Sequence, residues 1–145
     1  QKEDFASFHP GGSLGKRLFV KVKDLMQTEN LPIVSQKTKL KEAIVRMSEG
    51  RLGNVLIVDE KQKLLAILSD GDLRRALMRD DFSMDSKAFE YATKNPKKLD
   101  DATLLASDAL ALIETYKIQL LAITDKVGTL RGVLHIHHLV EAGIK

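Results

Sequence analysis

Apolar residues fall in short, regularly spaced groups along the chain. Between residues 40 and 47 they recur at i, i+3, i+4 and i+7, the spacing of one face of an amphipathic helix. Thr38 is a candidate N-cap for this helix and Gly50 a candidate stop. Unbroken aliphatic runs at residues 55–58 and 64–68 predict two buried strands. Because only a short polar turn separates these strands, we expect them to pair in antiparallel fashion.

The same pattern occurs twice. A shift of 66 positions carries residues 64–68 onto residues 130–134 without a gap. A second helix follows residue 68, and we expect its Leu73, Ala76 and Leu77 to face inward. Short strands at residues 33–34 and near Leu99 precede the first helix of each half. The order is β-α-β-β-α, twice, so we predict an α+β fold in which two like units bury their apolar faces on each other.

These boundaries divide the chain into three parts. Residues 1–21 precede the repeats, the first repeat covers residues 22–80, and the second covers residues 87–145. Residues 79–86 between the repeats are polar and typical of a linker.

Composition narrows the functional classes. The 145 residues are 43% hydrophobic and 30% charged, as in an ordinary globular protein. The absence of cysteine excludes disulfides and thiolate metal sites and agrees with a reducing cytoplasm, where we place the protein. No apolar run is long enough to span a bilayer, and the net charge of +3 comes from scattered lysines. We therefore expect neither a membrane nor a nucleic acid as partner.

The repeat resembles a known family. A tandem β-α-β-β-α unit with VKDLM near its start and LLAILSDGDLRRAL at its end is similar to a pair of cystathionine-β-synthase-type (CBS) domains, over residues 22–143. The resemblance implies two repeats related by a pseudo-two-fold axis, with ligand clefts between them. It also implies binding of adenine nucleotides or other small ligands, regulation of an attached enzyme, and dimers of CBS pairs.

Ser69 and Asp72 stand where the second predicted strand of the first repeat runs into a helix. Their S-x-x-D spacing is that of a capping box, in which each side chain accepts a hydrogen bond from the backbone N–H of the other residue. The same geometry suits a nucleotide, because free N–H groups at a helix N-terminus favour phosphate. In nucleotide-binding CBS pairs, residues of these types at these positions bind ribose and phosphate, so the resemblance carries over to both residues. Capping alone and capping with ligand binding stay open as alternatives.

The second repeat departs from this pattern. His135 and His138 stand where Ser69 and Asp72 stand in the first repeat. An imidazole does not offer the paired acceptor oxygens that bind a ribose diol, so we expect at most one standard adenosine site. Together with His137 these residues also suit zinc, nickel or copper. No further ligand stands at a clear spacing except Glu141, so we assign no metal and leave the role of the histidines open.

The segment FHPGGSLGKRL at residues 8–18 has the look of a phosphate loop but fails on spacing. Its glycines match neither G-x-x-x-x-G-K-[ST] nor G-x-G-x-x-G. It is similar to the end of the sugar-isomerase domain in bacterial arabinose 5-phosphate isomerases, and residues 132–143 are similar to that family's GVLHxHDLxxAG ending. The resemblance implies that His9 belongs to an isomerase active site, and that the chain is a fragment whose upstream isomerase domain is missing.

The resemblance thus implies a parent enzyme that interconverts ribulose 5-phosphate and arabinose 5-phosphate. Its product would feed the biosynthesis of the sugar Kdo for lipopolysaccharide or capsule. The fragment alone would not catalyse. We expect no cofactor, and a regulatory ligand (an adenine nucleotide or a CMP-sugar) at Ser69 and Asp72. The alternative is an oligomerisation module that binds no ligand.

Overall fold

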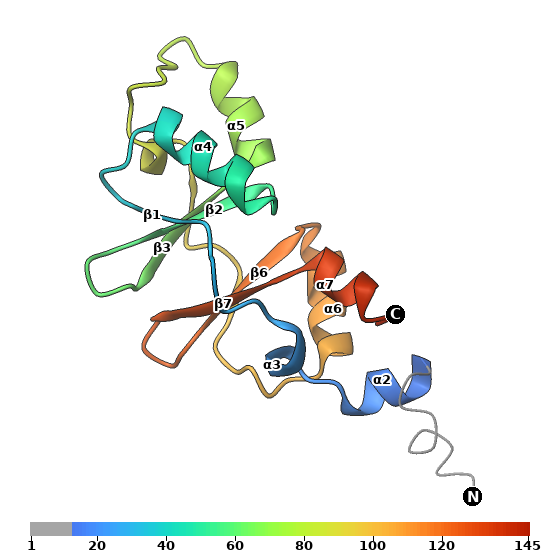
Figure 1. Cartoon of the computed structure of the whole chain (residues 1–145). Helices are drawn as coiled ribbons and strands as arrows, with labels where there is room; N and C mark the ends of the chain where they lie inside the picture. The colour runs from blue at the N-terminus through green and yellow to red at the C-terminus, as the bar shows by residue number, and fades with distance from the viewer. Residues whose placement is uncertain (1–12) are drawn as a thin grey trace, which may run out of the picture.

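The computed structural model describes residues 13–145 and has two similar halves that lie one against the other (Figure 1). The first half contains β1 (Ile33–Ser35), α4 (Leu40–Gly50), β2 (Asn54–Val58), β3 (Leu64–Ser69) and α5 (Asp70–Leu77). The second contains β5 (Lys98–Leu99), α6 (Ala106–Tyr116), β6 (Leu120–Thr124), β7 (Leu130–His135) and α7 (Ile136–Glu141). The expected order is confirmed in both halves. Within residues 13–145, no helix is long and apolar enough to cross a membrane.

The 66-residue repeat of the sequence is also the repeat of the structure. It carries α4 onto α6, β2 onto β6, β3 onto β7 and the start of α5 onto the start of α7, without insertion or deletion. In each half the long hairpin is antiparallel, as expected, and a short strand joins it in parallel. The two helices of each half cover the face of the sheet that is turned away from the other half (Figure 1).

The first residues of each repeat pack on the other half, so the two repeats exchange their opening segments. Helix α3 (Val22–Leu25) is followed by Gln27, whose backbone N–H and carbonyl both bond to Val133 of β7. In the same way the 3-10 helix η1 (Ala88–Glu90) is followed by β4 (Thr93–Lys94), which pairs with β3. This exchange of segments requires the backbones of Gln27 and Gly132 to lie very close, because a Cβ at Gly132 would lie 2.6 Å from the Gln27 carbonyl oxygen. The second half therefore depends on residues that come before the first half in the chain.

The exchanged segments complete two separate helical cores. Val22 is fully buried among apolar residues of the second half, and helix α2 (Ser13–Phe19) lies beside α6. Ala88, Tyr91 and Ala92 are buried in the corresponding core of the first half. A third apolar cluster lies between the two sheets and holds the halves together; its buried members are Leu56, Val58, Ile67, Leu120, Ala122, Leu130 and Val133.

Two local expectations need correction. Leu77 was expected to face inward, but 58% of it is exposed, whereas Ala76 is buried and Leu73 packs on the core. Lys39, and not Thr38, occupies the N-cap position of α4, and its side chain makes no capping hydrogen bond; the Thr38 hydroxyl accepts from the Ser35 N–H. The helix does end at Gly50, as expected.

The exchange makes a test of stability straightforward. The substitution Val22→Ala removes a fully buried side chain from the second half, and we expect it to lower the free energy of unfolding by about 1–3 kcal/mol. The matched control is Val127→Ala, on an exposed hairpin, with an expected effect within about 0.5 kcal/mol. Urea unfolding followed by circular dichroism measures both. Equal effects of the two substitutions would contradict the exchanged arrangement.

Candidate ligand-binding site

Ser69 and Asp72 form the capping box at the junction of β3 and α5. The Asp72 N–H donates to Ser69 Oγ at 3.1 Å, and the Ser69 N–H donates to Asp72 Oδ2 at 3.0 Å. The capping expectation is therefore confirmed. Ser69 has extended backbone angles, so the strand runs straight into the helix, and the Asp70 N–H of the first turn donates to the Gly53 carbonyl at 3.0 Å.

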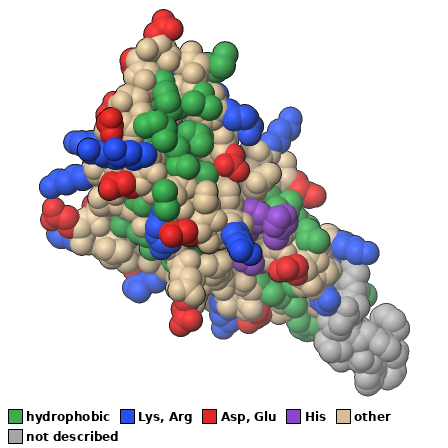
Figure 2. Space-filling model, turned by 45° about the horizontal axis from the view of Figure 1, so that its top comes forward, with side chains coloured by type: hydrophobic (Ala, Val, Ile, Leu, Met, Phe, Trp, Pro, Cys, Tyr) green, Lys and Arg blue, Asp and Glu red, His purple; other side chains and the backbone are tan. Residues whose placement is uncertain are grey.

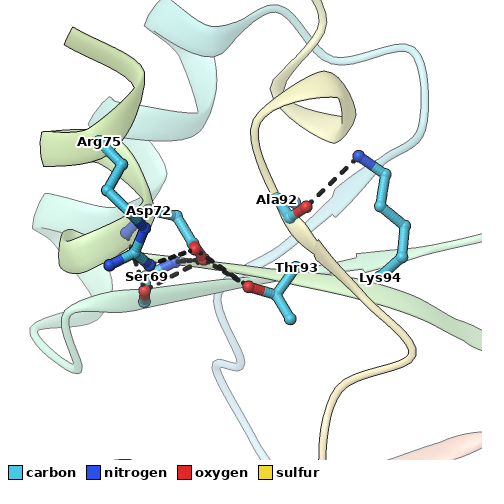
Figure 3. A network of polar contacts seen from close by, with 6 residues as sticks. All are labelled: Ser69, Asp72, Arg75, Ala92, Thr93 and Lys94. Carbon is cyan, nitrogen blue, oxygen red and sulfur yellow. Dashed lines mark hydrogen bonds and ion pairs between the residues drawn. The ribbon is translucent and has the colours of Figure 1, made fainter. Parts of the chain in front are cut away.

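Two further residues converge on the Asp72 carboxylate (Figure 3). Arg75 Nη2 donates to Oδ1 at 2.8 Å, and Thr93 Oγ1 lies 3.0 Å from Oδ1 and 3.2 Å from Oδ2. Asp72 is buried, and burial by itself would raise the pKa of its carboxyl group. The hydrogen bonds from Ser69, Arg75 and Thr93 outweigh burial and lower that pKa, so the group is a carboxylate at neutral pH.

This junction opens into a cleft between the two halves, with a volume of about 480 Å³. The first half contributes Gly53, Asn54, Ile67 and the first turns of α5, and the second contributes residues 96–97 and 117–120. Its cationic members Arg74, Lys97 and Lys117 make no salt bridge with another described residue. The cleft thus joins a buried carboxylate, a helix N-terminus and a cationic rim, which is a suitable environment for a polar, anionic ligand.

A larger groove of about 1060 Å³ lies at the tip of the β2–β3 hairpin, away from this junction. Four exposed lysines and three acids line it, so its charges are mixed. Two of the acids already accept backbone N–H bonds: Asp59 from residues 61 and 63, and Glu90 from Lys87. The smaller cleft is the better candidate, because it alone of these two contains a buried ionised group.

The junction of β7 and α7 reproduces the capping geometry with imidazoles. The His135 N–H donates to His138 Nδ1 at 2.9 Å, and the His137 N–H donates to His135 Nδ1 at 3.0 Å. His135 is buried, and its ring centroid lies 4.6 Å from that of His137. Figure 2 shows histidine side chains gathered at one place on the surface. The imidazoles therefore replace the side-chain oxygens of Ser69 and Asp72 as acceptors.

The surroundings of the second junction also differ in charge. Val140 and Glu141 occupy the positions that correspond to Arg74 and Arg75. Gln27 corresponds to Thr93, and its side chain donates to the backbone carbonyls of residues 29 and 30. This junction has neither a carboxylate at the helix start nor an arginine pair, so it does not repeat the first site.

The described residues contain no group of three or more His, Cys, Asp or Glu side chains placed to hold a metal ion. His9 lies outside the described residues. Three members of the cleft were missed by the sequence analysis, namely Thr93, Lys97 and Lys117. Thr93 lies on the exchanged strand β4 and the two lysines lie in the second half, and nothing in their spacing from Ser69 signals the contact.

Comparisons with known proteins agree with this description. The CBS domain family matches residues 22–79. An uncharacterized protein of Helicobacter pylori (strain ATCC 700392 / 26695) is 50% identical over 144 residues, which are 99% of this chain and 44% of the relative. The arabinose 5-phosphate isomerase KdsD of Pseudomonas aeruginosa is 41% identical over 143 residues, again 44% of the relative. The chain thus spans less than half the length of these curated relatives.

Solved structures share the fold. The structure of CBSX2 in complex with AMP superposes with a TM-score of 0.75 and 25% sequence identity, over 86% of this chain and 96% of that chain. This agreement extends over both halves and therefore covers the pair and not one repeat alone.

The histidine junction generates a prediction about pH. Burial, together with the nearby histidines, lowers the pKa of both His135 and His138 from the ordinary value of 6.5, against opposing effects of the Leu52 carbonyl and Glu141. The unfolded chain then binds more protons than the folded one as the pH falls through 6.5. We expect full stability above that pH and a progressive loss below it, measured as the urea midpoint between about pH 8 and about pH 5.5.

Variants assign this effect to the two capping imidazoles. The double substitution His135→Asn, His138→Asn keeps side-chain acceptors that do not titrate, and should flatten the pH dependence. His137→Asn removes a nearby histidine but neither capping imidazole, so it should reduce the pH dependence only slightly. An unchanged pH dependence in the double variant would refute the assignment.

Proposed function

We propose that this chain, a pair of CBS domains similar in sequence to arabinose 5-phosphate isomerases, binds one nucleotide in the cleft beside Asp72. The bound nucleotide would regulate an isomerase domain of the same protein. The observation that carries the proposal is the buried Asp72 carboxylate at the N-terminus of α5, inside a cleft with a cationic rim. One nucleotide per chain follows from the histidine junction, which lacks these features.

Each part of a nucleotide meets suitable groups in the cleft. The Asp72 carboxylate is an acceptor for the two hydroxyls of a ribose. The Asp70 and Asp72 N–H groups are already bonded to the Gly53 carbonyl and to Ser69 Oγ. Attraction for phosphate therefore comes from the positive end of α5 and from Arg74, Lys97 and Lys117 nearby. Ile67, Ile118 and Leu120 supply an apolar wall for a base. An adenine nucleotide and a CMP-sugar both meet these requirements, and the second would report on the product of the pathway.

The regulated reaction would be the interconversion of ribulose 5-phosphate and arabinose 5-phosphate, which supplies Kdo for lipopolysaccharide or capsule. Support comes from the relation to KdsD and from the HPGG segment, in which His9 would act in catalysis within the isomerase domain. A route for regulation exists through α2, which is fixed to the second half. Ser107 Oγ donates to the Arg17 carbonyl at 3.2 Å, and the Ala106 N–H donates to the Val20 carbonyl at 2.8 Å. A ligand held by both halves would therefore act on the helix that leads to the isomerase domain.

A second candidate function is assembly of the parent enzyme without a ligand. Hydrophobic side chains gather on the end of the molecule that carries α4 and α5 (Figure 2). The exposed fractions there are 58% for Val45, 58% for Leu77 and 84% for Met78. Such an exposed apolar face favours self-association.

Calorimetric titration with AMP, ATP and CMP-Kdo tests the nucleotide proposal. We expect heat with at least one of them, at one site per chain. The substitution Asp72→Asn should weaken binding about tenfold or more, because hydrogen bonds to a charged group contribute about 1.5–3 kcal/mol. Asp108→Asn, at an exposed carboxylate in the first turn of α6, is the matched control and should bind normally. No heat with any of the three ligands would rule them out.

Sedimentation velocity tests the assembly function separately. Leu77→Asp places a charge on the exposed apolar face, so we expect it to shift a dimer toward the monomer without changing nucleotide affinity. Leu104→Asp, at an exposed leucine of the second half, is the control for an added charge. A sedimentation coefficient that responds equally to both substitutions would contradict a specific role for the α4–α5 face.

A further inference from the structure

The acceptor positions of Asp72 are already occupied in this structure. Four donors reach the carboxylate: the Ser69 N–H, Ser69 Oγ, Arg75 Nη2 and Thr93 Oγ1 (Figure 3). A carboxylate offers about four acceptor positions, so none is left for the two hydroxyls of a ribose. A ligand with a diol must therefore displace at least one donor.

The four donors are not equally easy to displace. The two from Ser69 bond to Oδ2, and the bond from its N–H is the reciprocal half of the capping box, so their loss would leave the part-buried Ser69 N–H without this partner. The donors on Oδ1 are Arg75 and Thr93. Thr93 lies on β4, whose backbone is fixed by pairing with β3, so its hydroxyl can leave Asp72 only by a change of side-chain rotamer. The Arg75 side chain is 72% exposed, so its charge is easily transferred to water.

Arg75 also lies across the place where phosphate would bind. A Cβ at Gly71 would come within 3.4 Å of Arg75 Nη1 and 3.5 Å of Nη2, so the guanidinium rests over the first turn of α5. Without a ligand, the Arg75 guanidinium therefore occupies Oδ1 of Asp72, where a ribose hydroxyl would bind, and also covers the approach to the helix N-terminus.

We propose that Arg75 is a gate for the cleft, and that the ligand is a ribonucleotide that opens it with two groups at once. The ribose diol takes Oδ1 of Asp72 from the guanidinium, and the released guanidinium pairs with the phosphate. A nucleoside, which has the diol but no phosphate, must displace Arg75 without compensation. Arg75 thus makes the cleft selective for phosphorylated ligands. This inference rests on the proposed nucleotide site.

The substitution Arg75→Met keeps the aliphatic part of the side chain and removes the competing donor. We expect it to tighten the binding of adenosine about threefold to tenfold, because an ion pair with one exposed partner is weak and its loss is a gain for the competing ligand. The binding of 2′,3′-dideoxyadenosine should not change, since this ligand has no diol. The affinity for AMP should rise less than the affinity for adenosine, because the AMP phosphate loses Arg75 as a partner. Calorimetry measures all three dissociation constants.

Arg74→Met is the matched control, since Arg74 lines the same cleft without contacting Asp72. It should not tighten adenosine. Thermal unfolding of both variants confirms that they fold. The gate is overturned if Arg75→Met leaves the affinity for adenosine unchanged or lower. It is also overturned if the affinity for 2′,3′-dideoxyadenosine rises as much as the affinity for adenosine. If the wild type binds AMP in that case, the nucleotide site stands without the gate; if neither protein binds adenosine or AMP, both proposals fall.

Discussion

The reciprocal exchange of backbone segments between the halves is the interaction on which the rest of the structure depends. Gln27 bonds to β7 and Thr93 lies on β4 beside β3, so each half is completed by the first residues of the other repeat. The apolar cluster between the sheets then fixes the two halves at a short separation. The cleft exists because of this arrangement: Thr93 reaches Asp72 only as a member of the exchanged strand. A single repeat would possess the capping box but not the cleft.

Within this near-symmetrical frame, function follows from a few positions where the repeats differ. At the start of α5 the Asp72 carboxylate accepts a hydrogen bond from Arg75. The start of α7 has imidazoles instead, and a glutamate follows them. Both arrangements cap their helices, so both satisfy the fold. Only the first places negative charge where a ribose would bind and positive charge where a phosphate would bind. The fold therefore tolerates the divergence of the second junction, and only the first junction keeps groups suited to a nucleotide.

Much of this could be predicted from the sequence, for reasons that are local. The periodicity of residues 40–47 and the aliphatic runs at residues 55–58 and 64–68 determine helix and strands, and the three-residue spacing of Ser69 and Asp72 determines the cap. The contacts of Thr93, Lys97 and Lys117 depend on how the halves meet, which spacing does not encode. Comparison of the repeats predicted that His135 and His138 differ from Ser69 and Asp72. It did not predict that their Nδ1 atoms accept backbone hydrogen bonds. Leu77 was placed inward on helical periodicity, yet it lies at the exposed end of its helix.

The central claim is that one cleft, beside Asp72, binds a nucleotide and that the histidine junction does not. Amide chemical-shift mapping by NMR during titration with AMP tests it most directly, because it reports on both junctions in the same sample. The account predicts that shifts concentrate at Gly53, at residues 69–72, at Thr93 and at residues 117–119, while residues 137–138 stay unchanged. The Ile136 N–H donates to the Gln119 carbonyl, so its shift does not distinguish the two junctions. Shifts that concentrate at residues 137–138, or that are equal at both junctions, would contradict it.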